Sequence, residues 1–90
     1  MDEIYYYCSH LAWQIEPSTK TVFILDKRTN EMTIIEDSGR DIWLLISKES
    51  TLRDIIEKIS ISYECDVSEI QDEILEFFTE LLEKELIYEI

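Results

Sequence analysis

The sequence predicts an α+β fold in which a three-stranded antiparallel sheet is followed by three helices. Alternating and β-branched segments occupy the first half of the chain, which is typical of strands. Apolar residues at helical spacing occupy most of the second half. A chain of 90 residues with 46% hydrophobic residues has enough apolar material for one small core but not for two domains.

The predicted strands come first in the chain. Leu11, Trp13 and Ile15 alternate with other residues, which is the period of a half-buried strand. Residues 21–25 are apolar or β-branched throughout, as in a central strand covered on both faces. Asn30, well suited to a left-handed conformation, ends the polar turn that leads to a third strand over residues 32–35. The meander has open edges on its outer strands.

The predicted helices start at capping pairs three residues apart. These pairs are Ser38 with Asp41, Thr51 with Asp54, and Ser68 with Gln71. The third helix runs to about Glu85, and residues 86–90 form a short extended tail. Its apolar sector is wider than the roughly 100° that a surface helix needs. Either the other two helices cover all of this sector, or part of it faces a groove.

Acidic residues dominate the charge. The chain has 21 Asp and Glu against 8 Lys and Arg, for a net charge of -13, and residues 64–90 hold ten of the acids and one base. Nucleic acid binding requires the opposite sign. A basic peptide or protein surface is a better partner for this field. Alternatively, the acidity only keeps the protein soluble.

The sequence offers no group of residues for catalysis or metal binding. Cys8 and Cys65 are expected to be reduced thiols, and Cys8 with His10 lacks the second pair of a zinc site. His10 is the only histidine and is expected on the surface, while the single glycine, Gly39, excludes glycine-rich phosphate loops. We therefore expect a binding module with no enzymatic activity, no metal and no cofactor.

Targeting signals are also missing from the sequence. No apolar run approaches the ~20 residues of a membrane span, and the N-terminal residues lack the basic start and apolar stretch of a signal peptide. We therefore expect a cytoplasmic protein that has no membrane partner.

Three strands followed by three helices give a winged-helix-like architecture, and such folds often bind DNA through the last helix. In this chain, the last helix carries Glu where a DNA reader would carry Arg and Lys. A DNA-binding regulator therefore remains an alternative on fold alone. A structural adaptor subunit, whose wide helix stripe packs permanently on a partner, is the second alternative.

Ordered motifs from Leu11 to Ile87 resemble the PqqD-like RiPP recognition elements, which bind the leader peptides of ribosomally made, modified peptides. The matching segments are LAWQIE at 11–16, ILDKRTN at 24–30, IE at 35–36, DIWLL at 41–45, TLRDIIEKI at 51–59, and the apolar positions from Tyr63 to Ile87. Asn30 and Glu85 replace glycines of the family pattern. We expect residues 11–90 to form one peptide-binding domain, with residues 1–10 as an N-terminal segment that extends the first strand.

The resemblance implies that the leader adds as a β-strand to the edge of the third strand, in the cleft beside the third helix. On the strand, the implied site consists of Glu31, Met32, Thr33, Ile34 and Ile35. Because Ile35 matches a core leucine of the family, Met32 and Ile34 are assigned to the groove.

Across the groove, the candidate apolar residues are Ile74, Phe77, Phe78 and Leu81. Asp72 and Glu73 would meet the lysines of a basic leader at the rim. The resemblance also implies a separate modifying enzyme that receives the peptide, either a radical-SAM enzyme or the leader protease of a lasso-peptide pathway. The LAWQIE start and the IW segment look more like the lasso type.

Overall fold

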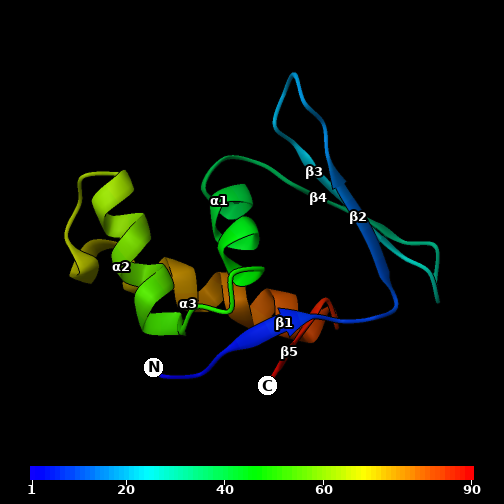
Figure 1. The fold of residues 1–90 in the computed structure, drawn as a ribbon. Helices are drawn as coiled ribbons and strands as arrows, with labels where there is room; N and C mark the ends of the chain where they lie inside the picture. The colour runs from blue at the N-terminus through cyan, green and yellow to red at the C-terminus, as the bar shows by residue number, and fades with distance from the viewer.

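The computed structural model describes residues 1–90, and its elements form two sheets and three helices (Figure 1). The strands are β1 (Tyr5–Tyr7), β2 (Leu11–Ile15), β3 (Val22–Asp26), β4 (Met32–Ile35) and β5 (Ile87–Glu89). The helices are α1 (Asp37–Ile46), α2 (Leu52–Ser62) and α3 (Val67–Glu83). The predicted α+β class and the order of three strands before three helices are confirmed.

The larger sheet is antiparallel and has the order β2-β3-β4. On its inner face Val22, Ile24 and Ile35 are buried, because all three helices lie on this side of the sheet (Figure 1). On its outer face Phe23 and Leu25 are only half-buried. β3 is therefore the central strand, as predicted, but the helices cover one of its faces and not both.

The two hairpin turns of this sheet take left-handed residues. Asn30 has a φ of 62°, as predicted from its residue type, and Lys20 in the other turn has the same value. In that turn the Glu16 carboxylate accepts hydrogen bonds from the main-chain N–H groups of Ser18 and Thr19, at 3.0 and 2.7 Å. Hydrogen bonds from Ser18 and Thr19 lower the pKa of Glu16 to about 2.

The helix starts agree with the sequence at one of three positions. Thr51 caps α2, where its hydroxyl accepts the Asp54 N–H at 3.1 Å. α1 follows Glu36 and α3 follows Asp66, and neither cap residue makes a side-chain hydrogen bond. The capping pairs predicted at Ser38 and Ser68 are therefore wrong. The chain already has a helical conformation at both serines, so neither can act as the extended residue before the first turn.

The N-terminal residues form a strand of the second sheet and do not extend β2. β1 pairs with β5 in antiparallel register, with Tyr6 opposite Tyr88. The tyrosines on either side of Tyr6 pack inward. Tyr7 lies between the indoles of Trp43 and Trp13, with ring centroids 4.4 and 5.3 Å away. Its hydroxyl donates to the main-chain oxygen of the fully buried Trp43. This aromatic cluster joins the two sheets to α1.

The ends of α2 and α3 share one geometry. α3 stops at Glu83, and Glu85 takes a φ of 59°. The Glu85 and Leu86 N–H groups donate to the carbonyls of Leu82 and Leu81, at 3.0 and 2.9 Å, which is a Schellman motif. α2 ends in the same way, with a φ of 52° at Glu64. Glu85 thus takes the left-handed conformation that would suit a glycine.

Candidate functional site: an open sheet edge beside a cleft

β4 is an edge strand, because it pairs with β3 on one side and with no strand on the other. In an antiparallel pair, successive residues direct their main-chain N–H and C=O groups alternately toward and away from the partner. The Asp26 N–H donates to the Glu31 carbonyl at 2.9 Å, so Glu31 faces β3. By alternation, Met32 and Ile34 direct their N–H and C=O groups to the open edge. This edge can therefore receive a further strand.

Two hollows lie between the β4 side of the molecule and α3. The apolar hollow, of about 350 Å³, lies where the three helices meet. Its lining residues are Ser38, Gly39, Ile42, Ile59, Tyr63, Ile70, Glu73, Ile74 and Phe77. The polar hollow, of about 400 Å³, lies at the start of β4 and the end of α3. Its lining residues are Asp26, Arg28, Thr29, Glu31, Met32, Thr33, Glu83, Lys84, Glu85 and Leu86.

Gly39 brings the apolar hollow close to the end of β4. A Cβ atom at this position would lie 2.9 Å from Cγ2 of Ile35 and 3.3 Å from the ring of Phe77. The φ of Gly39 is not positive, so the requirement for glycine is one of space and not of backbone conformation. The side chain of a larger residue would occupy the place where β4, α1 and α3 meet.

One stripe of α3 faces the cleft. Ile70, Glu73 and Phe77 line the apolar hollow, and Lys84 lines the polar hollow. These residues follow one another at intervals of three, four and seven, so they share one side of the helix. Glu80 falls on the same stripe by its spacing. The helix therefore presents apolar groups near its start and charged groups toward its end.

The family model for Coenzyme PQQ synthesis protein D (PqqD) matches residues 21–87, which include the strands β3 and β4 and all three helices. The chain belongs to the PqqD family. The resemblance of its motifs to PqqD-like recognition elements is thereby confirmed. Proteins of this family that bind leader peptides are generally non-catalytic.

A solved structure described as "TbiB1 in Complex with the TbiA(beta) Leader Peptide" has a fold similar to that of this PqqD-family chain. The match has a TM-score of 0.83 and 20% sequence identity, and it covers 91% of this chain and 93% of that chain. At this identity the likeness establishes a shared fold. A comparison with curated proteins found no match.

On β4 of the PqqD-family chain, the side chains of Met32 and Ile34 lie on the outer face of the sheet. Each is 55% exposed, and by the register they lie opposite Leu25 and Phe23. Ile35 faces the core as expected, but the cleft opens on that same inner side. The assignment of the Met32 and Ile34 side chains to the groove therefore needs correction: these residues offer their main chain to the edge.

The candidate residues on α3 differ in how they reach the cleft. Glu73 and Phe77 lie on the stripe that faces it, and Ile74 also lines the apolar hollow, although it is only 3% exposed. Phe78 and Leu81 are each 2% exposed and belong to the hydrophobic core. A peptide in the cleft could not reach these last two side chains, so their role is to support the stripe from behind.

Asp72 lies away from the cleft. It is exposed, lines neither hollow, and is rotated by about 100° around the helix from Glu73. Sequence reasoning missed the wall of the apolar hollow that α1 and α2 contribute, including Gly39 and Tyr63. The single glycine of the chain was a signal of close approach, whereas nothing local in the sequence indicated Tyr63.

Hydrogen bonds fix the charged groups around both hollows. At the polar hollow, Arg28 Nη2 lies 3.0 Å from Oδ2 of Asp26 and 2.7 Å from Oε2 of Glu85. The hydrogen bond from Arg28 lowers the pKa of Asp26 to about 2. Tyr63, which lines the apolar hollow, donates its hydroxyl to the Asp41 carboxylate, and this bond raises the pKa of Tyr63.

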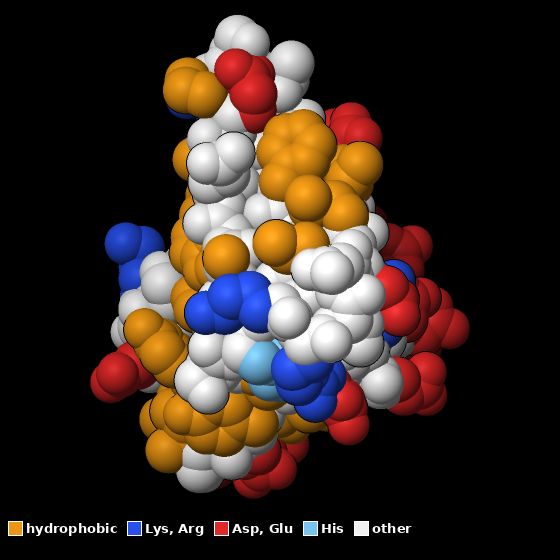
Figure 2. Space-filling model, turned by 90° about the vertical axis from the view of Figure 1, so that its right-hand side faces the viewer, with side chains coloured by type: hydrophobic (Ala, Val, Ile, Leu, Met, Phe, Trp, Pro, Cys, Tyr) orange, Lys and Arg blue, Asp and Glu red, His pale blue; other side chains and the backbone are white.

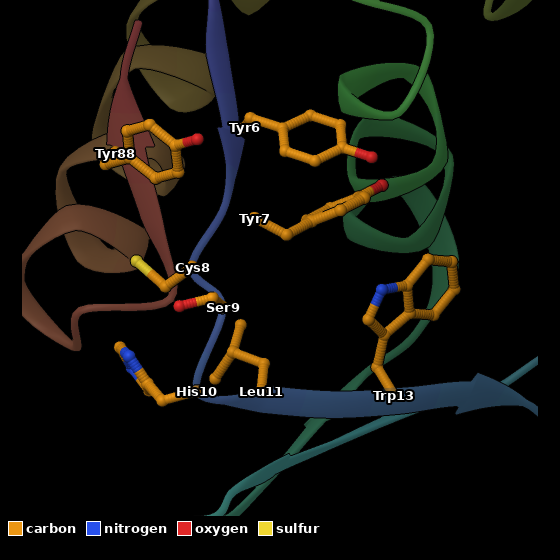
Figure 3. Close-up of a pocket in the computed structure, with 8 residues that line it drawn as sticks. All are labelled: Tyr6, Tyr7, Cys8, Ser9, His10, Leu11, Trp13 and Tyr88. Carbon is orange, nitrogen blue, oxygen red and sulfur yellow. The ribbon is translucent and has the colours of Figure 1, made fainter.

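A larger hollow, of about 560 Å³, lies apart from the cleft, beside β1, β2 and β5 (Figure 3). Cys8 and His10 both line it. Burial raises the pKa of the Cys8 thiol, which keeps it protonated, and Nε2 of His10 lies 2.8 Å from the main-chain oxygen of Glu85. His10 is half-buried and not on the open surface as expected. These two groups do not form an activated nucleophile and base.

The structure contains no group of three or more His, Cys, Asp or Glu side chains placed to hold a metal ion. Both cysteines are free. None of the three helices combines the length and the apolar character needed to cross a bilayer.

Proposed function

We propose that this protein binds the leader region of a ribosomally made precursor peptide and presents it to a separate modifying enzyme. The observation that carries the proposal is the open edge of β4 beside a cleft, in a chain of the PqqD family. The leader adds as a strand to this edge, where it pairs with the free main-chain groups of Met32 and Ile34. The TbiB1 structure, a complex with a leader peptide, supports this mode for a related fold.

Side-chain pockets in the cleft select the leader. The apolar hollow accepts an apolar side chain, because Ile42, Ile70 and Phe77 line it. Glu73 at its margin and Glu80 on the same stripe attract cationic side chains. An apolar anchor next to lysine or arginine is therefore the preferred leader sequence, and the net charge of -13 favours a basic leader as a whole.

The protein itself carries out no chemistry on the peptide in this proposal. Its role is to hold the leader in an extended conformation while the modifying enzyme acts on the same precursor. A lasso-peptide leader protease and a radical-SAM enzyme are both compatible with this role. The identity of the enzyme follows from the genes beside the one that encodes this protein.

A proline at the edge tests the proposal with little disturbance of the fold. Ile34→Pro removes an N–H that points to the open edge, and proline is tolerated at such edge positions. Loss of one main-chain hydrogen bond, about 1–1.5 kcal/mol, should weaken leader binding about tenfold. The measurement is calorimetric titration of a synthetic peptide with the leader sequence of the precursor encoded beside this gene.

The matched control is Ile34→Thr, which keeps the N–H and a β-branched side chain on the outer face. We expect the control to bind the leader with nearly the affinity of the unmodified protein. Thermal unfolding of both variants checks that the fold is retained. Equal leader affinities for Ile34→Pro and Ile34→Thr in folded protein would show that the leader does not pair with this edge.

A further inference from the structure

The outer face of the β2-β3-β4 sheet is apolar and uncovered. We call it the outer sheet face, and it consists of Ala12, Gln14, Phe23, Leu25, Met32 and Ile34. Figure 2 views this side of the molecule and shows hydrophobic side chains along its middle, with acidic side chains gathered at the margin. A shallow hollow of about 240 Å³, lined largely by this face, provides a seat for a side chain of another molecule.

The charge of the protein avoids this sheet. Residues 11–35 carry three acids and three bases, whereas the remaining residues carry 18 acids and five bases. The whole net charge of -13 therefore belongs to the rest of the chain. Within the sheet, Asp26 is paired with Arg28, and Glu16 accepts hydrogen bonds from its own turn. A surface that is neutral and apolar in so acidic a protein is typical of a protein–protein contact.

Two lysines stand at opposite ends of the outer sheet face. Lys20 lies in the turn between β2 and β3, and Lys27 follows the last residue of β3. Both are exposed, and neither forms an ion pair in the structure. By the alternation of the strand, Lys27 extends the row of Phe23 and Leu25 on this face. The partner that fits is therefore a protein surface with an apolar centre and acidic groups at its margin.

We infer that the outer sheet face is the docking surface for the modifying enzyme, an inference that rests on the proposed function. Met32 and Ile34 link the two sites, because their main chain faces the open edge and their side chains lie on the outer sheet face. An enzyme seated there lies directly beside the leader on β4. The basic leader and the enzyme thus use adjoining surfaces of different charge.

Charge-introducing variants test the inference away from the β4 edge. Ala12→Glu and Lys27→Glu alter exposed side chains of the outer sheet face and its margin, on β2 and after β3. Each should weaken binding of the purified modifying enzyme encoded beside this gene at least tenfold. Lys48→Glu, an exposed charge reversal after α1, is the matched control and should leave enzyme binding unchanged. All three variants should bind the leader peptide with the affinity of the unmodified protein.

The outcomes separate this inference from the proposed function. Unchanged enzyme affinity for Ala12→Glu and Lys27→Glu, or normal leader binding without any enzyme binding, would overturn the docking surface. Sedimentation that shows a dimer dissolved by Ala12→Glu would overturn it in favour of a second copy of the chain. Failure of the unmodified protein to bind the leader, with enzyme binding that Ala12→Glu abolishes, would refute the proposed function and leave the docking surface standing.

Discussion

Gly39 occupies the point where β4, α1 and α3 come together, and a single added carbon would crowd two of them. Gly39→Val would place its side chain against Ile35 and the ring of Phe77. We expect overpacking to cost about 1–3 kcal/mol of unfolding free energy and the narrowed apolar hollow to weaken leader binding. Urea unfolding and leader titration measure the two effects. Ser38→Ala, at the exposed neighbouring position, should change stability little; equal stability of the two variants would contradict the close approach.

Asp26 makes stability depend on pH in a defined direction. Hydrogen bonding to Arg28 lowers its pKa from the ordinary value of 3.8 to about 2. A carboxyl whose pKa is lower in the folded state stabilises the protein above its unfolded pKa, and this contribution disappears as the pH falls through the folded pKa. We therefore expect the difference in unfolding midpoint between the unmodified protein and Asp26→Asn to shrink as the pH falls from 4 toward 2. A difference that is constant over this range would show that Asp26 is not linked to folding in this way.

Single residues were predictable from the sequence where one local property decides their place. Asn30 adopts a positive φ because its short side chain tolerates that conformation, and Ile35 is buried because the strand alternates. The groove assignment of Met32 and Ile34 failed for a different reason. The side of the sheet on which the cleft opens depends on where α3 packs, and the strand's own pattern contains no information on that.

At the scale of elements, the ends of α2 and α3 carry a removable strain. Glu64 and Glu85 hold the left-handed position of two Schellman motifs, where a residue other than glycine costs roughly 1 kcal/mol. Glu64→Gly should therefore raise the unfolding free energy by about that amount, measured by urea unfolding. Glu85→Gly should gain less, because Glu85 also pairs with Arg28. A loss of stability in Glu64→Gly would contradict the assignment of this helix end.

The elements themselves were mostly predictable, and the starts of two helices were not. Hydrophobic periodicity is local, so it located β2, β3, β4 and the bodies of the helices. The serine at 38 and the serine at 68 both precede apolar runs, but the chain enters each helix earlier, at Asp37 and Val67. A capping sequence shows that a residue can cap, and only the path of the preceding chain decides whether it does.

At the scale of the whole molecule, charge and surface are separated. The acids of α3 lie beside the cleft and on the solvent side, while the sheet is neutral. Charges at the rim of a site act mainly on the rate of association. Glu73→Gln combined with Glu80→Gln should slow association of a basic leader several-fold at low salt, with little change in dissociation. Asp72→Asn, which removes one charge from the side of α3 away from the cleft, should have a smaller effect; an equal effect per charge would indicate attraction by net charge alone.

The pairing of β1 with β5 lay beyond sequence reasoning. It joins residues from opposite ends of the chain, and no periodicity within Tyr5–Tyr7 identifies its partner. The same limit applies to the apolar hollow, whose wall comes from α1, α2 and α3 together. The family resemblance indicated the right edge and the right helix, whereas the residues that line the cleft depended on tertiary packing.

The central claim is that a leader strand pairs with the free main-chain groups of β4. Hydrogen exchange resolved at each amide by NMR measures this pairing directly. Without leader, we expect fast exchange at Met32 and Ile34 and slow exchange at Thr33 and Ile35, whose amides already face β3. Saturating leader peptide should slow exchange at Met32 and Ile34 at least tenfold. Continued fast exchange at both amides in the fully bound protein would contradict strand addition at this edge.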